Sequence, residues 1–417
     1  MGNRKTMKMC AVHFTSKRTL ARKSAAAAAL LMCLISGSAI AQNRAGTKDW
    51  PTGSPKEFGI DPEKLAAFDA DLDSGKYGLV DSMLVLRCGT AVYEKSYKHD
   101  YGQIYGERAK KEGPLNHDMH GPYNYFSTLF HPFYQGSDMH TMQSVSKTVT
   151  SVTIGIARAR NDFIAGLDTP IVKYFEARKI ANLDDRKKRI TLRDLLTMTA
   201  GFEWHEDLPY DDPKNSADLM EASRDWAQYV IDQPMANEPG KVFVYNSGAT
   251  VLLAHIFKKV TGKNVDVYAD EHLFKPLGMR YYWKQSPTGL PDTEGGLYLS
   301  AHDLAKIGQL FLKGGMWGGK EIVSDRWIKE SVSPHVAVAG GDWKYGYQWW
   351  LQSFGSTPED IAWTARGFGG QQLLVAPPYD MVVVFTGWDI LPSAEKRPHD
   401  WLARILDAAN RFYGCAE

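Results

Sequence analysis

The sequence of 417 residues is poor in cysteine and lacks the short motifs that mark many enzyme classes. It has four cysteines and no Cys-x-x-Cys pair, which argues against a structural zinc site and a dithiol redox centre. The motifs Gly-x-Ser-x-Gly, Walker A, His-Glu-x-x-His and Gly-x-Gly-x-x-Gly after a strand are also absent. A nucleophile elbow, a P-loop, a zinc protease and a dinucleotide-binding domain are therefore set aside.

A basic excess is missing from most of the chain. Charged residues make up 23% of the sequence and hydrophobic residues 44%, which is enough apolar surface for a packed core. Residues 1–41 carry seven Lys or Arg and no acid, which leaves 42 basic against 48 acidic residues afterwards. We therefore expect no nucleic-acid partner, because neutralising phosphates requires a basic surface.

Long apolar runs are absent after the amino terminus. Basic residues up to Lys23 precede an uncharged stretch, Ser24–Ala41, that contains AAAAALLMCLI and ends in Ala39-Ile40-Ala41. This pattern predicts a secretory signal over residues 1–41, cut before Gln42. The alternative, a membrane anchor, suits the short apolar run less well. We expect a periplasmic or secreted mature chain, 42–417, with no stable membrane span.

Two of the cysteines remain after removal of such a signal. Cys88 and Cys415 lie near the two ends of the mature chain. In an oxidising compartment they predict a disulfide between an early strand and the last helix, and two unpaired thiols are the alternative. The histidine-bearing stretches are more typical of solvated surface, so we expect no metal and no other cofactor.

The periodicity places strands at both ends of the mature chain and helices between them. A helix starts at Asp61-Pro62, and two β-rich runs, 82–88 and 90–97, are separated only by Gly89. A second pair, 371–377 and 381–388, precedes a helical segment over 394–412. The helices expected between these ends are 145–160, 191–199, 218–232, 248–260 and 301–313.

This order predicts an α+β fold in one domain over residues 42–417. An antiparallel sheet is built from both chain ends and flanked by helices, and a mainly helical lobe is inserted. The sheet lobe is expected at about 58–140 and 345–417 and the helical lobe at about 145–340. A cleft between the lobes is the default position of a site.

Ser144 and Lys147 open the apolar helix at 145–160. Residues three apart share a helix face, so the hydroxyl and the amine can meet there. Serine needs a base to become a nucleophile, and lysine serves if burial and the helix amino terminus lower its pKa. An ordinary helix start with a solvated lysine is the alternative, because Ser-x-x-Lys alone is a weak motif.

Two further segments add polar groups that suit acyl transfer. Tyr245 follows a Pro239-Gly240 turn and an expected short strand, and stands where the helix at 248–260 begins. A phenol beside a cation can relay protons, although a buried tyrosine is the alternative. The run Arg366-Gly367-Phe368-Gly369-Gly370 enters the penultimate strand, where glycines let backbone N–H groups approach a ligand or form a bulge.

Several short sequence blocks between about residues 58 and 412 occur in the same order as in one protein family. The sequence resembles the class C β-lactamase-like serine hydrolases, the penicillin-recognising fold, and within them the 6-aminohexanoate-dimer hydrolases and family VIII carboxylesterases. The blocks are SVSK, ITLRDLLTMTAGFEW, EPGKVFVYNSGATVLLAHIFKKVTG, LFKPLGM, GGLYLSAHDLAKIGQLFLKGG, YGYQWW and GFGGQQLLVAP.

The resemblance implies roles for individual residues. Ser144 matches the acylated serine, Lys147 the lysine that helps to deprotonate it, and Tyr245 the tyrosine that passes the proton to the leaving group. The backbone N–H of Ser144 and one N–H of the Gly367–Gly369 stretch match the oxyanion hole of the family. Within that stretch, Phe368 is the residue expected to donate.

Two departures from the family pattern concern β-lactam turnover. Position 247 is Ser where β-lactamases have Asn, so that the amide is missing or is supplied by Asn246. The stretch 363–366 lacks the lysine of Lys-Thr-Gly.

The function expected is hydrolysis of a small amide or ester through an acyl-enzyme on Ser144. A peptidoglycan D,D-peptidase or a penicillin-binding or β-lactamase activity is one alternative, and a non-catalytic binding relative is another. The loop 202–215 is expected to border the cleft, where its acids either attract a cationic substrate group or are simply solvated. The sequence does not indicate an oligomeric state.

Overall fold

The computed structural model describes residues 50–210, 212–391, 400–411 and 413–415. The expected secretory signal at 1–41 lies outside this part of the chain, as does the beginning of the helical segment expected over 394–412. In the part described, none of the helices has both the length and the apolar character of a membrane span.

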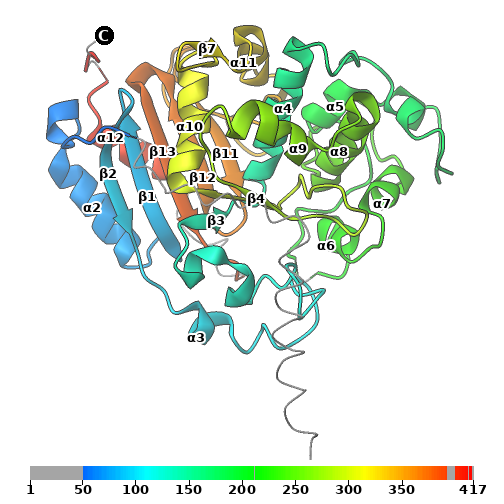
Figure 1. The fold of residues 1–417 in the computed structure, drawn as a ribbon, viewed down its shortest axis with the longest axis horizontal. Helices are drawn as coiled ribbons and strands as arrows, with labels where there is room; N and C mark the ends of the chain where they lie inside the picture. Colours follow the sequence, from blue (N-terminus) through cyan, green and yellow to red (C-terminus); the bar gives the residue numbers. More distant parts are fainter. Residues whose placement is uncertain (1–49, 211, 392–399, 412, 416–417) are drawn as a thin grey trace, which may run out of the picture. The chain divides into compact units, whose positions relative to one another are not determined.

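An antiparallel sheet of eight strands forms the centre of the fold (Figure 1). Strands from both ends of the sequence pair at its middle, where β1 lies beside β13 and Leu84 faces Val384. This confirms the predicted sheet built from both chain ends. The strand order is β2 (Thr90–Ser96), β1 (Val80–Arg87), β13 (Met381–Gly387), β12 (Gln371–Ala376), β11 (Ile361–Gly367), β10 (Trp350–Ser353), β9 (Trp343–Tyr345) and β8 (Val336–Ala337).

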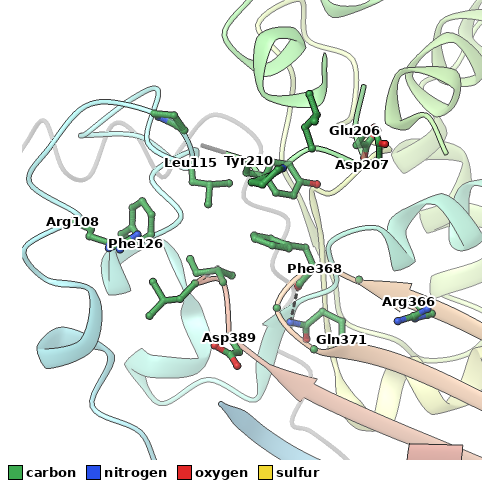
Figure 2. Close-up of a pocket in the computed structure, with 18 of the residues that line it drawn as sticks. Arg108, Leu115, Phe126, Glu206, Asp207, Tyr210, Arg366, Phe368, Gln371 and Asp389 are labelled. Carbon is green, nitrogen blue, oxygen red and sulfur yellow. Dashed lines mark hydrogen bonds between the residues drawn. The ribbon is translucent and has the colours of Figure 1, made fainter. Parts of the chain in front are cut away.

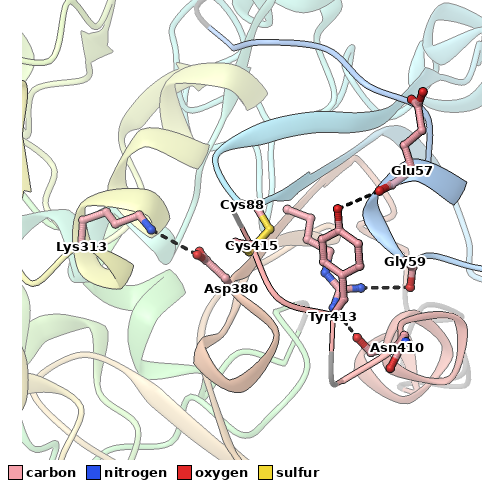
Figure 3. The surroundings of a disulfide bond; sticks show 9 residues. Glu57, Gly59, Cys88, Lys313, Asp380, Asn410, Tyr413 and Cys415 are labelled. Atoms are coloured by element: carbon pink, nitrogen blue, oxygen red, sulfur yellow. Dashed lines mark hydrogen bonds and ion pairs between the residues drawn. A yellow bond between two sulfur atoms is a disulfide. The ribbon is translucent and has the colours of Figure 1, made fainter. Parts of the chain in front are cut away.

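The first hairpin turns through two residues rather than through Gly89 alone. Cys88 and Gly89 have φ angles of 52° and 70°, as a two-residue turn with left-handed conformations requires. Cys88 also forms a disulfide with Cys415, with the Cα atoms 5.6 Å apart, as one of the two sequence interpretations predicted. It joins the turn after β1 to the segment after α12 (Trp401–Ala408), not a strand to the last helix. Figure 3 shows that the carboxyl-terminal segment is held beside it, where the Tyr413 hydroxyl donates to the Glu57 carbonyl at 2.7 Å.

Both faces of the sheet are buried, which explains why its central strands read as almost continuous apolar runs. Met83 and Val85 of β1 pack in a core with α2 (Pro62–Asp73) and α12 (Trp401–Ala408). Leu84 and Leu86 point to the other face, which α10 (Ala301–Leu312) covers (Figure 1). This arrangement confirms the predicted α+β class.

Several helix starts follow from their capping residues. Asp61 accepts from the backbone N–H groups of residues 63 and 64 at the start of α2, and Ser300 accepts from Asp303 at the start of α10. Thr191 and Asp194 form a reciprocal capping box at the start of α5 (Leu192–Leu196). These helices begin where the sequence predicted.

The central helices comprise α4 (Val145–Ala159), α5, α6 (Ser216–Glu221), α7 (Trp226–Asp232), α8 (Ser247–Thr261) and α9 (Val265–Ala269). The prediction of one helix over 218–232 is wrong. The chain leaves the helix after Glu221, and the Asp225 carboxylate caps α7 by accepting from the Gln228 N–H at 3.1 Å. Aspartate is more favourable at a helix N-cap than inside a helix, so Asp225 starts a new helix and the segment 218–232 is divided into two.

The short strand expected before Tyr245 is also absent from the described structure. Residues 241–246 contain no strand, and the Val244 N–H is bonded to the Met198 carbonyl at 2.9 Å. The apolar residues Val242, Phe243 and Val244 therefore reflect an extended connection into α8, not a sheet strand.

The remaining elements are short. A second sheet has the order β3 (Met139–Thr141), β5 (Leu297–Ser300) and β4 (Tyr282–Trp283), and a third pairs β6 (Met316–Trp317) with β7 (Lys320–Glu321). The other α-helices are α3 (Tyr101–Tyr105) and α11 (Asp325–Ser331). Short 3-10 turns span Lys56–Phe58, Thr128–Phe130, Pro132–Gln135, Ile171–Tyr174, Lys187–Arg189 and Pro377–Tyr379, and a π turn spans Asp270–Phe274.

Candidate active site

Ser144 and Lys147 meet at the amino terminus of α4. Ser144 is the residue before the first turn of the helix, and Lys147 lies one turn further on the same face. The Lys147 Nζ atom donates to Ser144 Oγ at 2.7 Å. The lysine is buried, with 1% of its surface exposed, so the sequence-predicted hydroxyl–amine pair exists and does not point into bulk solvent.

Tyr245 joins this pair from the segment that enters α8. The Lys147 Nζ atom lies 5.2 Å from the centroid of the Tyr245 ring. The ring of Trp350, on β10, stacks on the ring of Tyr245, with 5.6 Å between the two ring centroids. The phenol, the amine and the hydroxyl therefore converge from segments about a hundred residues apart, the arrangement that the family resemblance implies.

The protonation of the lysine differs from the sequence expectation. Burial by itself would lower the pKa of Lys147, but Tyr245, Glu294 and Glu206 raise it, and the pKa lies above its ordinary value. Burial raises the pKa of the Tyr245 phenol, and its interactions with Lys147 and Ser144 reverse this only in part. The expected depression of the lysine pKa is wrong because three acidic groups surround the amine.

The glycine-rich turn between β11 and β12 lies against the segment that leads to Ser144. A Cβ atom on Gly367 would lie 2.4 Å from the Met142 carbonyl oxygen, so only glycine fits this approach. Gly369 has φ +83° and completes the turn. Within the described part of the chain, the backbone N–H groups of Ser144 and Phe368 have no hydrogen-bond acceptor.

Asn246 and Ser247 both serve the start of α8. Asn246 is buried, and its Oδ1 atom accepts from the Ala249 N–H at 3.0 Å, which caps the helix. Ser247 donates its hydroxyl to Glu206. The second carboxylate oxygen of Glu206 accepts from the Trp204 indole at 2.8 Å.

A pocket of about 550 Å³ lies between the β11–β12 turn and the loop that carries Glu206 (Figure 2). Ser144, Lys147 and Tyr245 are not part of its lining. Two lining residues lie towards them: Glu206, which raises the pKa of Lys147, and Gly367, which approaches the Met142 carbonyl. The rings of Phe368 and Tyr210 lie 4.7 Å apart. Of the 202–215 loop that was expected to border the cleft, residues 206–210 line this pocket. Other lining residues are Tyr77, Arg108, Lys111, Leu115, Phe126, Asp207, Arg366, Gln371, Asp389, Ile390 and Trp401.

Arg366 adds a cation to this region, to which the sequence motifs assign no role. Its guanidinium lies over the rings of Trp343 and Trp350, 5.2 and 5.8 Å from their centroids. No carboxylate of the described residues pairs with it. Burial lowers the pKa of Arg366, as desolvation of an unpaired cation does.

One further arrangement concerns metal ligands. Among the described residues, Cys88, Asp380 and Cys415 are the only three potential metal ligands close together. Because both sulfurs belong to the disulfide, no thiolate is available there.

Comparison with known proteins places these features in a family. The Beta-lactamase family matches residues 82–403. A Salmonella paratyphi A protein provisionally named D-alanyl-D-alanine carboxypeptidase is 21% identical over 418 residues, which covers 87% of this chain and 89% of that protein. A Bacillus anthracis structure provisionally named 6-aminohexanoate-dimer hydrolase superposes with a TM-score of 0.61 at 21% identity, covering 86% of this chain and 87% of that one.

A family VIII carboxylesterase is also similar in fold, with a TM-score of 0.58 at 17% identity over 84% of this chain and 97% of that one. These structural likenesses agree with the antiparallel sheet and its covering helices. With the family match extending over most of the described residues, the chain belongs to the Beta-lactamase family.

Proposed function

We propose that this protein is a serine hydrolase that cleaves small amides or esters through an acyl-enzyme on Ser144. The observation that carries the proposal is the 2.7 Å contact between the Lys147 amine and the Ser144 hydroxyl beside the Tyr245 ring. Membership of a family of hydrolases supports it. A nucleophile with its base and a third titratable group in contact is the arrangement that acyl transfer requires.

In the acylation step, Ser144 Oγ attacks the substrate carbonyl carbon and gives its proton to the Lys147 and Tyr245 cluster. Because the pKa values of Lys147 and Tyr245 are both raised, both groups hold their protons at neutral pH. The cluster must therefore lose one proton before it can accept that of Ser144. The N–H groups of Ser144 and Phe368 are free to stabilise the oxyanion, an effect of about 3 kcal/mol for each donor. The leaving alcohol or amine then takes a proton from Tyr245 as its bond to the carbonyl carbon breaks.

Deacylation repeats these roles with water as the nucleophile. Water gives a proton to the cluster, attacks the acyl carbon, and Ser144 recovers its proton as the acid product leaves. The cycle uses only residues of this chain.

The size and lining of the adjoining pocket support a small organic substrate. A volume of about 550 Å³ lies in the range typical of small-molecule sites. Phe126, Tyr210 and Phe368 offer apolar surface for one part of the substrate. The carboxylates of Glu206 and Asp207 lie on the loop at its edge.

The decisive experiment is covalent labelling together with ester cleavage. Wild-type protein should bind a fluorophosphonate at Ser144 and hydrolyse p-nitrophenyl butyrate, and Ser144→Ala should do neither. Ser151→Ala is the matched control, because Ser151 lies on the same helix and its buried hydroxyl has no hydrogen-bond partner among the described residues. Labelling that persists in Ser144→Ala would refute the proposal.

Arg366 favours a second candidate, cleavage of an amide beside a free carboxylate. An unpaired guanidinium close to Tyr245 can accept a substrate carboxylate through two hydrogen bonds. The provisional carboxypeptidase name of the Salmonella relative is consistent with this candidate. Comparing a D-alanyl-D-alanine peptide and a 6-aminohexanoate dimer with their carboxyl-amidated forms tests it, since only the free acids should be good substrates.

We further propose that the protein acts outside the cytoplasm. The basic and apolar pattern of residues 1–41 and the Cys88–Cys415 disulfide both suit an exported chain. Cell fractionation with and without residues 1–41 tests this proposal, and full-length protein that stays in the cytoplasm with both thiols free would contradict it.

A further inference from the structure

Lys147 has a second anchor on the side opposite to Ser144. Its Nζ atom donates to the backbone carbonyl of Glu294 at 2.8 Å, and the Glu294 carboxylate lies 3.8 Å from the same nitrogen. The side chains of Lys147 and Glu294 are both buried. One residue therefore supplies both a hydrogen-bond acceptor and a charge to the amine, and the two together fix its direction toward Ser144.

Glu294 in turn contacts a second carboxyl group. The side chain of Glu221, the last residue of α6, interacts with the Glu294 carboxyl group, and this interaction raises the pKa of Glu221. Glu221 also accepts from the Tyr125 hydroxyl at 2.8 Å. Two interacting carboxyl groups can form a hydrogen bond with each other only if one of them carries a proton.

The charges around this pair also favour a retained proton. Lys284 and Asp292 are fully buried, and the Lys284 Nζ atom lies 3.9 Å from the Asp292 carboxylate. The amine also lies over the rings of Tyr123 and Tyr125, at 4.3 and 4.6 Å. Lys147 and Lys284 face the carboxyl groups of Glu294, Glu221, Asp292 and Glu206, so acids outnumber amines in this region. A retained proton lowers the uncompensated charge, which is costly in a buried cluster.

We propose that Glu294 is a positioning residue that holds Lys147 against Ser144, and that Glu221 keeps Glu294 ionised by carrying the one proton that the two carboxyl groups share. This inference rests on the proposed serine hydrolase function, and it assigns a role to two residues outside the Ser144, Lys147 and Tyr245 set. Glu294 acts on the reaction through Lys147, since its contacts are with the amine and not with the pocket.

The electrostatics agree with this assignment of the proton. Burial raises the pKa of both carboxyls, and the Lys147 amine partly opposes this at Glu294, which lies beside it. The charged and titratable groups that act on Glu294 are Asp292, Lys147, Glu221 and Glu206. Those that act on Lys147 are Tyr245, Glu294 and Glu206. Loss of the Glu294 charge must therefore lower the pKa of Lys147.

The test compares Glu294→Gln and Glu221→Gln by the pH dependence of fluorophosphonate labelling, measured in short pH jumps. In Glu294→Gln we expect the rising limb of the rate to move to lower pH by about one unit, because an opposite charge at this distance is lost. Its limiting rate should also fall as Lys147 is held less well. In Glu221→Gln, which imitates the protonated carboxyl, the limb should stay where it is in the wild type.

Three outcomes would overturn the inference. These are an unmoved limb in Glu294→Gln, an upward shift in that variant, or an equal downward shift in Glu221→Gln. If Glu294→Gln does not fold, Glu294→Asp replaces it, because this variant keeps the charge and the backbone carbonyl. A rising limb of the labelling rate that moves to lower pH in Glu294→Asp would contradict the proposal. Ser144→Ala separates the two levels, because persistent labelling there refutes the hydrolase proposal whatever the glutamate variants show.

Discussion

The Glu206 carboxylate receives both the hydroxyl and the backbone N–H of Ser247, at 2.5 and 2.7 Å. This contact joins the loop that borders the pocket to the first turn of α8, two residues after Tyr245. A carboxylate at a helix amino terminus is also favoured by the unpaired N–H groups of the first turn. The serine that replaces the asparagine of β-lactamases thus has a partner of its own in this chain.

Ser247→Ala is expected to weaken this connection. The lost hydrogen bond to a charged group should lower the free energy of unfolding by about 1.5–3 kcal/mol, and looser placement of Tyr245 should reduce kcat more than it changes KM. Urea unfolding and p-nitrophenyl ester kinetics measure the two effects. Ser151→Ala serves as the control for loss of a buried hydroxyl without a partner, and equal stability of the two variants would contradict the role given to Glu206.

The pH dependence follows from the raised pKa values of Lys147 and Tyr245. A group with a raised pKa keeps its proton to higher pH, so the form that can accept the Ser144 proton accumulates only as the pH rises. We expect kcat/KM for a p-nitrophenyl ester to increase through the neutral range without a plateau below about pH 9. A plateau near pH 6, after correction for spontaneous hydrolysis, would show that the amine is already neutral there.

Arg366→Ala is expected to discriminate between substrates. If the guanidinium binds a substrate carboxylate, kcat/KM for a carboxyl-bearing dimer should fall by about 100-fold, the effect of about 3 kcal/mol from a charged hydrogen-bonded pair. The rate for a neutral p-nitrophenyl ester should change by less than a few fold. Arg366→Lys keeps the charge but loses the paired geometry and should fall between the two, and a uniform loss on all substrates would point to a structural role.

The local parts of the site could be predicted from the sequence, and the long-range parts could not. Ser144 and Lys147 lie on one helix turn, so their spacing determines that they meet. Thr191 and Asp194 likewise mark a helix start by themselves. Tyr245 was found because it stands before an amphipathic helix, and its approach to Lys147 followed from the family resemblance.

Glu294 shows what the sequence could not reveal. It lies 147 residues from Lys147 and is placed there by the packing of β5 and its preceding loop against α4. Nothing in the stretch Asp292-Thr293-Glu294 distinguishes a buried carboxylate from a solvated one. The prediction that the lysine pKa falls failed for the same reason, since burial could be expected from the apolar helix but its acidic neighbours could not.

Gly367→Ala tests the close approach of the β11–β12 turn to the segment before Ser144. The new methyl group would lie 2.4 Å from the Met142 carbonyl oxygen, so backbone must move on one side of the site. We expect a loss of activity of at least about 100-fold, because catalytic geometry tolerates only small displacements. Gly341→Ala is the control, since its nearest neighbour is the edge of Trp343 at 3.4 Å, and full activity in Gly367→Ala would place the turn away from the reacting atoms.

The Cys88–Cys415 disulfide should stabilise the fold without taking part in catalysis. It joins the β1–β2 turn to the carboxyl-terminal segment, across 327 residues of sequence (Figure 3). Closing so long a loop restricts the unfolded chain, and Cys88→Ala combined with Cys415→Ala should lower the free energy of unfolding by about 2–5 kcal/mol. Thermal unfolding with and without reductant measures this, and the double variant should no longer respond to reductant.

The kcat of the double variant at 25 °C should equal that of the wild type, because the disulfide contacts Asp380 and neighbouring residues rather than the Ser144 cluster. A reductant effect that survives in the double variant would mean that the stabilisation comes from elsewhere.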